Sequence, residues 1–246
     1  MIKVEPNTMT RYRYAAAAAR YADSLTWENL MEAPAQGTQR KITLASLELV
    51  HAARPEVQVF NELLIQYPMP KDEIGQVVPD NTVVVHDRPL ELNGSFDVTF
   101  QPVGPFWVLE YVSKKNRRKD YDLNMKKYAY LKVPYYLTFY PDDEELSLFH
   151  LPPRGRRYKT VLPNERGRLA IPKLEIEVAI LDGWARYWFK GELLPLPAEL
   201  LRDLIEERRQ HDATRRQLDT TRRALEDERR ARQALEVELA RLRAKS

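Results

Sequence analysis

Residues 105–141 read PFWVLEYVSKKNRRKDYDLNMKKYAYLKVPYYLTFYP, and this stretch decides the fold. It begins with a continuous apolar and aromatic run, Phe106 to Val112, and ends with a second run, Tyr135 to Tyr140. Short runs of this composition are typical of buried strands. Between them, a cationic turn leads into a helical segment that ends near Leu131. The stretch therefore predicts a strand, a basic turn, a helix and a second strand.

One carboxylate interrupts the first apolar run. Glu110 stands between Leu109 and Tyr111, where a buried strand normally holds no charge. An ionised carboxylate in such a place costs several kcal/mol unless it is paired or bound to a metal. Glu110 is therefore the first indication of chemistry in this sequence.

Composition limits the classes of protein that the chain can belong to. The 246 residues include 39 basic and 36 acidic side chains, which gives a net charge of +3, so overall charge does not by itself indicate nucleic acid. The absence of cysteine excludes disulfides, thiolate catalysis and cysteine-ligated zinc. With eight glycines, no Gly-rich phosphate loop and no G-x-S-x-G motif, nucleotide-binding folds and serine hydrolases are disfavoured. No run of ~18 apolar residues is present, so we expect a cytoplasmic protein.

Around the central stretch, periodicity and turn residues predict further elements. Helices are expected at 11–23 and 39–53, one or two strands at 57–68, a strand at 82–86 and a hairpin at 90–103. Downstream, short strands at 145–151, 158–162, 169–171 and 174–181 predict a meander that extends the sheet. An aromatic patch is expected to pack on the core, and it consists of Trp184, Tyr187, Trp188 and Phe189.

The last part of the chain differs in composition. Residues 198–246 contain no Gly or Pro and are mostly Arg, Glu, Ala and Leu, which predicts a long polar helix. Leucines seven residues apart, Leu218 with Leu225 and Leu235 with Leu242, form two seams that are out of phase. An oligomerising coiled coil, a solvated single helix and a basic contact with nucleic acid all remain open. We expect a helical extension at 1–38, a main domain at 39–197 and this helix at 198–246.

Three acidic residues stand in apolar strand contexts, namely Glu62, Asp80 and Glu110. Carboxylates that converge at strand ends are the oxygen ligands that magnesium prefers. Each also has a structural interpretation. Asp80 could cap a turn after Pro79, Glu110 could pair with Arg117 or Lys119, and Glu62 could lie exposed on a two-faced strand.

Basic residues follow Glu110. Lys127 shares a helical stripe with Asp120, Asn124 and Leu131, from which it would reach a phosphate or orient a water, or else lie solvated. The preceding turn is either solvated or contacts the backbone of a polyanion, and it contains Lys114, Lys115, Arg117, Arg118 and Lys119.

Asp80, Glu110 and the residues around them resemble a known pattern. Pro79-Asp80, followed by Glu110 in an aromatic strand, resembles the PD-(D/E)XK nuclease superfamily. Residues 109–141 are similar in detail to the Uma-two family of restriction endonuclease-like proteins. The matching positions are Glu110, Val112, Ser113, Asp120, Tyr128, Val133, Pro134 and Tyr136. The resemblance covers about residues 39–181.

The resemblance implies a restriction endonuclease-like α/β fold, with a mixed sheet flanked by helices, that cuts a phosphodiester bond in DNA with Mg²⁺ or Mn²⁺. Asp80 and Glu110 would be metal ligands, the Tyr111 carbonyl a third, and Glu62 an accessory acid. In this hypothesis a metal-bound water attacks the phosphate, and Lys127 stabilises the transition state.

Two departures from the family pattern favour an alternative. The superfamily lysine expected two residues after the glutamate is Val112, and the helix lysine expected four residues before Tyr128 is Asn124. Lys127 or Lys114 would have to take the role of the missing lysine. The alternative is a catalytically inactive binding or scaffold protein that assembles as a homo-oligomer through its C-terminal helix.

Overall fold

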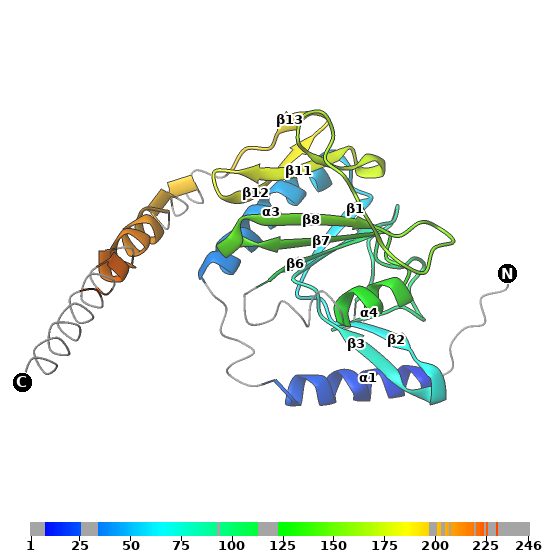
Figure 1. Cartoon of the computed structure of the whole chain (residues 1–246). Helices are drawn as coiled ribbons and strands as arrows, with labels where there is room; N and C mark the ends of the chain where they lie inside the picture. The colour runs from blue at the N-terminus through cyan, green and yellow to red at the C-terminus, as the bar shows by residue number, and fades with distance from the viewer. Residues whose placement is uncertain are drawn as a thin grey trace, which may run out of the picture. The chain divides into compact units, whose positions relative to one another are not determined.

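The computed structural model describes residues 8–25, 34–92, 94–112 and 123–196, together with parts of the helix between 201 and 230. The chain forms two compact units, residues 1–197 and 198–246. The helices of the first unit are α1 (Thr8–Asp23), α3 (Pro34–Ala53) and α4 (Met125–Tyr130), with short 3-10 turns at Pro70–Asp72, Pro141–Asp143 and Pro172–Leu174. Figure 1 shows these helices around the strands.

The central sheet has six strands in the order β1-β4-β6-β7-β8-β9. Its strands are β1 (Val57–Asn61), β4 (Asn81–Val85), β6 (Trp107–Tyr111), β7 (Tyr135–Tyr140), β8 (Glu145–His150) and β9 (Lys159–Thr160). The pair β6 and β7 is parallel, and the other pairs are antiparallel. The expected mixed α/β fold is confirmed, and so are the two strands of the central stretch with α4 as the crossover between them.

Helix α3 packs against this sheet through an apolar face. Ile42, Leu47 and Val50 on that face are fully buried. The helix begins at Pro34, five residues before the predicted start at Gln39. Buried Gln39 donates a 3.0 Å hydrogen bond to Ala185 O and accepts one of 2.9 Å from Ala185 N. The Gln39 side chain thus forms two hydrogen bonds of the kind that a neighbouring strand would form, and it links α3 to β12 (Trp184–Phe189).

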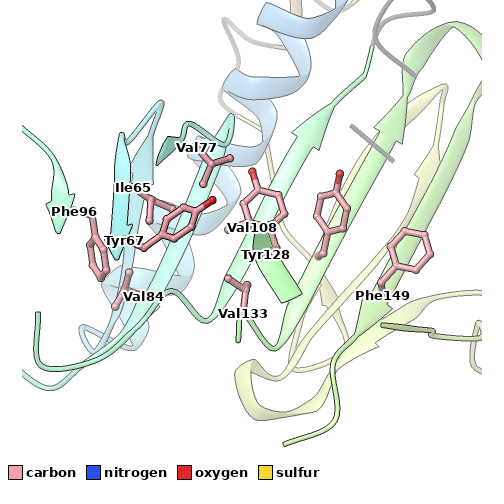
Figure 2. Packing of buried hydrophobic residues seen from close by; sticks show 10 residues of the cluster. Ile65, Tyr67, Val77, Val84, Phe96, Val108, Tyr128, Val133 and Phe149 are labelled. Carbon is pink, nitrogen blue, oxygen red and sulfur yellow. The ribbon is translucent and has the colours of Figure 1, made fainter. Parts of the chain in front are cut away.

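A second, three-stranded sheet has the order β3-β2-β5, with β3 (Ile74–Val77), β2 (Ile65–Pro68) and β5 (Phe96–Asp97). Apolar side chains from this sheet, α4 and the central sheet form one core. Its buried members, most of them drawn in Figure 2, are Ile65, Tyr67, Val77, Val84, Phe96, Val108, Tyr128, Val133, Tyr136 and Phe149. This core fixes α4 over the end of β6.

The structure corrects one prediction of local structure. Residues 90–103 were expected to form a hairpin, but their one strand among the described residues, β5, pairs in parallel with β2. Of the two alternatives for 57–68, the structure has two short strands, β1 and β2, which lie in different sheets. Strand partners are chosen by tertiary packing and not by the local turn signals.

The downstream strands do not all extend the central sheet. Only β8 and β9 do so, while β10 (Leu169–Ile171), β11 (Ile176–Leu181), β12 and β13 (Glu192–Leu193) form a separate four-stranded sheet. Trp184, Tyr187 and Trp188 on β12 are buried, as the packing interpretation predicted.

The second unit is helical wherever it is described. Its described apolar side chains are exposed, and they include Ile205, Leu218 and Leu225. Assembly through this helix stays a prediction. Among the described residues, no helix is long and apolar enough to cross a membrane.

Candidate active site

Asp80 lies next to the end of β6 because β4 and β6 are antiparallel neighbours. Asn81, the first residue of β4, pairs with Leu109, so the residue before β4 meets the residues after Leu109. Asp80 Oδ2 accepts a 2.7 Å hydrogen bond from the Tyr111 backbone N–H. The pairing of β4 with β6 therefore brings together Asp80 and Glu110, which are thirty residues apart in the sequence.

Glu110 is buried in β6 and is held by α4. Glu110 is one of the few buried charged residues, and it is 7% exposed. Asn124 Nδ2 donates a 3.1 Å hydrogen bond to Glu110 Oε1, and the Tyr128 hydroxyl donates to the same oxygen. Asn124 and Tyr128 are four residues apart, which places both on one face of the helix. These two donors fix the orientation of the carboxylate.

The Asp80 and Glu110 side chains are close neighbours, because the β4–β6 register places the residue before Asn81 next to the residue after Leu109. Burial raises the pKa of Asp80 above its usual value, although the Tyr111 amide, the Arg40 guanidinium and the Glu110 contact oppose this. Two adjacent acids with one raised pKa form an arrangement that a divalent cation would stabilise.

Arg40 on α3 bridges Asp80 and Glu62. Arg40 Nη2 lies 2.9 Å from Asp80 Oδ1, and Nη1 lies 2.8 Å from Glu62 Oε1. Glu62 does not lie in a strand as expected. It follows β1 in the left-handed region with a φ of 47°, and its side chain is 58% exposed. The side chain of the predicted accessory acid thus binds the guanidinium, while its backbone N–H donates to Asp80 O at 3.1 Å.

Lys127 lies on α4 beside the two residues that hold Glu110. Its Nζ donates a 3.0 Å hydrogen bond to the backbone oxygen of Gln76, at the end of β3. Asn124, at the position where the family resemblance implies a lysine, contacts Glu110 instead. The predicted basic contacts Lys114, Lys115, Arg117 and Arg118 lie outside the described residues.

The donor atoms fit a hard cation only in part. Asp80 and Glu110 supply carboxylate oxygens, and the adjacent Tyr111 carbonyl is a third oxygen donor of the kind magnesium prefers. That carbonyl accepts a 3.0 Å hydrogen bond from Gln36 Nε2. Within the described ranges, no group of three or more His, Cys, Asp or Glu side chains is placed to hold a metal. Water or substrate oxygens would therefore complete the coordination.

Sequence reasoning missed two partners of these acids, Arg40 and Tyr128, and also Gln36, which donates to the Tyr111 carbonyl. The pairing of Arg40 with Asp80 spans 40 residues of the chain. A cation is expected near any buried carboxylate, but the residue that provides it depends on helix packing. Tyr128 gave a local signal, because it follows Asn124 by one helical turn.

No curated protein gives a significant match. One solved structure is described as a "putative nuclease belonging to DUF820 from Anabaena variabilis ATCC 29413"; it is 17% identical, covers 58% of this chain and 75% of its own, and has a TM-score of 0.43. A family model named Uma2 matches residues 27–181. The match covers more than half of the chain, which therefore belongs to the Uma2 family, described as "Putative restriction endonuclease".

Proposed function

We propose that this protein is a divalent-metal-dependent endonuclease that hydrolyses phosphodiester bonds in DNA. The observation that carries the proposal is the placement of Asp80 and Glu110 next to each other by the pairing of β4 with β6. Membership of a restriction endonuclease family supports the reaction class. We place Mg²⁺ or Mn²⁺ between these two acids, with the Tyr111 carbonyl beside them. A cation bound there lowers the pKa of a water and neutralises charge that develops on the phosphate.

The surrounding residues position the two acids. Asn124 and Tyr128 orient Glu110 through its Oε1. Arg40 and the Tyr111 amide orient Asp80. Because each acid is held by at least two donors, the pair is organised before a cation binds, which lowers the reorganisation that the reaction would require.

Lys127 completes the proposed catalytic set. It lies one residue before Tyr128, and its amine already contacts the backbone at Gln76. We assign it the stabilisation of negative charge on the phosphate. Lys114, Lys115, Arg117 and Arg118 follow β6 directly in the sequence, and we assign them to contacts with the phosphate backbone of the substrate.

Plasmid cleavage tests the proposal. Purified protein with Mg²⁺ or Mn²⁺ is expected to nick or linearise supercoiled DNA, and Asp80→Asn and Glu110→Gln are each expected to reduce the rate at least about a hundredfold. Asp87→Asn is the matched control, because Asp87 is exposed in the loop after the other end of β4. Cleavage that survives both site substitutions would remove these acids from the mechanism.

A catalytically inactive scaffold is the second candidate, and Asn124 favours it. An amide stands where the family resemblance implies a lysine, and it is engaged with Glu110. In this case the domain at 39–197 would only bind, and the helix at 198–246 would assemble the chains. Calorimetry that detects no binding of Mg²⁺ or Mn²⁺ would favour this function. Sedimentation of the chain with and without residues 198–246 would show whether the helix sets the oligomeric state.

A further inference from the structure

A concave surface lies between α1 and β3. It is a groove of ≈ 630 Å³. One wall is α1, and the opposite wall is formed by β3 and the short turn before it, including Asp72, Glu73 and Gln76. Figure 1 shows α1 running beside β3 and β2. We call this surface the α1 groove.

The sequence of α1 explains the shape of the groove. Tyr12-Arg13 and Arg20-Tyr21 stand on either side of an alanine run, and Ala16 and Ala17 line the groove between them. Residues spaced three and four apart lie on one helical face, so the two Tyr-Arg pairs flank a floor of methyl groups. The result is a trough with an aromatic ring and a guanidinium at each end.

Hydrogen bonds hold α1 in place. Gln66 Nε2 donates to Tyr14 O at 3.1 Å, and Gln76 Nε2 donates to Ala17 O at 3.0 Å. The Tyr14 hydroxyl lies 2.9 Å from Thr99 Oγ1. Side-chain amides from the sheet therefore bind the helix backbone, and the groove exists before any ligand arrives.

The α1 groove is connected to α4 through Gln76. This residue lines the groove, and its backbone oxygen accepts the hydrogen bond from Lys127. A ligand in the groove would thus contact a residue that binds the lysine of the proposed catalytic set.

The charges of the groove limit the ligand. Arg20 favours a phosphate, and Arg13 adds a second guanidinium, which donates to the backbone oxygen of Asp72 and lies 4.0 Å from the Asp72 carboxylate. Asp72 and Glu73 on the opposite wall repel a continuous phosphate backbone. Carboxylates accept hydrogen bonds from the amino groups of nucleobases, and exposed aromatic rings stack on base faces. Tyr12 is 70% exposed, so its ring is accessible. The faces of bases are accessible in a single strand, whereas in a duplex they are already stacked.

We propose that the α1 groove binds one nucleotide of a single-stranded segment of the nucleic-acid substrate, with its base against Tyr12 or Tyr21 and its phosphate against Arg13 or Arg20. This assignment rests on the proposed function, because it treats nucleic acid as the ligand. It adds a specificity element, since a substrate with unpaired nucleotides near the cleaved bond would bind more tightly than a continuous duplex.

Fluorescence anisotropy of the full chain tests the assignment. The labelled probe is a single-stranded DNA oligonucleotide, and EDTA is present so that no cleavage can occur. Tyr12→Ala and the double variant Arg13→Gln, Arg20→Gln are each expected to weaken binding about fivefold or more. Arg154→Gln, an exposed arginine in the turn after β8, is the matched control and is expected to leave binding unchanged.

Arg20→Gln alone is a second, conservative variant at an exposed position. Measuring its melting temperature shows whether the variant chain is folded, so a loss of binding can be separated from a loss of folding. Binding by Tyr12→Ala and Arg20→Gln within about twofold of the unaltered chain would overturn the assignment. A free nucleotide is the alternative ligand for the groove, and adenosine monophosphate is the competitor that tests for it. If adenosine monophosphate binds as tightly as the oligonucleotide, the assignment to a strand is wrong.

The outcome is separable from that of the nuclease proposal. Loss of binding in the groove variants, together with no cleavage by the unaltered chain, would support the groove and contradict the nuclease. Metal-dependent cleavage with unchanged binding in the groove variants would support the nuclease and contradict the groove.

Discussion

Asn124 Nδ2 donates a 3.1 Å hydrogen bond to Glu110 Oε1, and both residues are buried. This bond links α4 to β6 and fixes the orientation of a carboxylate inside an apolar strand. In the resemblance that the sequence indicates, a lysine is implied at this position. An amide is a neutral donor, whereas a lysine would bring a positive charge to the same carboxylate.

Asn124→Leu is expected to lower the free energy of unfolding by about 1.5–3 kcal/mol at neutral pH, because a buried charged acceptor loses a donor. Denaturant unfolding followed by circular dichroism measures the change. Lys126→Ala on the exposed side of the same helix is the control and is expected to change stability by less than about 0.5 kcal/mol. Equal stability of the two variants would contradict the proposed role of the amide.

Tyr128→Phe removes one hydroxyl and keeps the ring that packs in the core. The Tyr128 side chain is fully buried and donates to Glu110. We expect a loss of about 1.5–3 kcal/mol and weaker binding of Mg²⁺, because Glu110 becomes free to rotate. Urea unfolding and titration calorimetry measure the two effects. Tyr130→Phe, whose hydroxyl is exposed and donates to Pro68 O, is the comparison in which metal affinity should not change.

Gln39→Ala is expected to destabilise the first unit by about 2–5 kcal/mol. The substitution leaves both the N–H and the C=O of Ala185 without their described partner in a buried region, and each such group costs about 1–3 kcal/mol. Thermal and denaturant unfolding measure the loss. Glu48→Ala lies on the exposed side of the same helix and should have little effect. A loss no greater than that of the control would show that water replaces the bridge.

Alkaline pH is expected to unfold the protein through its buried tyrosines. Burial raises the pKa of Tyr111, Tyr128 and Tyr187 above the ordinary value of about 10. Above that pH the unfolded chain releases protons that the folded chain retains, so the folded state loses stability as the pH rises. Stability from these groups is fully present below pH ~10.

Tyr187→Phe isolates one of these groups. It removes the hydroxyl that lies 2.7 Å from Thr43 Oγ1 and keeps the ring. Above pH ~10, the dependence of the unfolding free energy on pH should become shallower by about 1.4 kcal/mol per pH unit, which corresponds to one proton. Urea unfolding at several alkaline pH values measures the slope. An unchanged slope would show that Tyr187 ionises in the folded state.

The sequence by itself determined the strand, helix and strand of residues 105–141, because periodicity and composition act locally there. It also indicated Asp80 and Glu110, since a carboxylate in an apolar strand is a local anomaly. It did not determine the partners of these acids. Local signals could not show that β5 pairs with β2, or that β10 to β13 form their own sheet.

Tertiary structure alone decided which groups surround the acidic pair. Arg40 reaches Asp80 because α3 packs on the central sheet, and Asn124 reaches Glu110 because a buried core holds α4 over β6. The same packing placed Glu62 in a turn, where its backbone N–H donates to Asp80 O at 3.1 Å and its side chain binds the Arg40 guanidinium. Such contacts join residues tens of positions apart, and their geometry follows from the burial of many side chains at once, which no short stretch of sequence specifies.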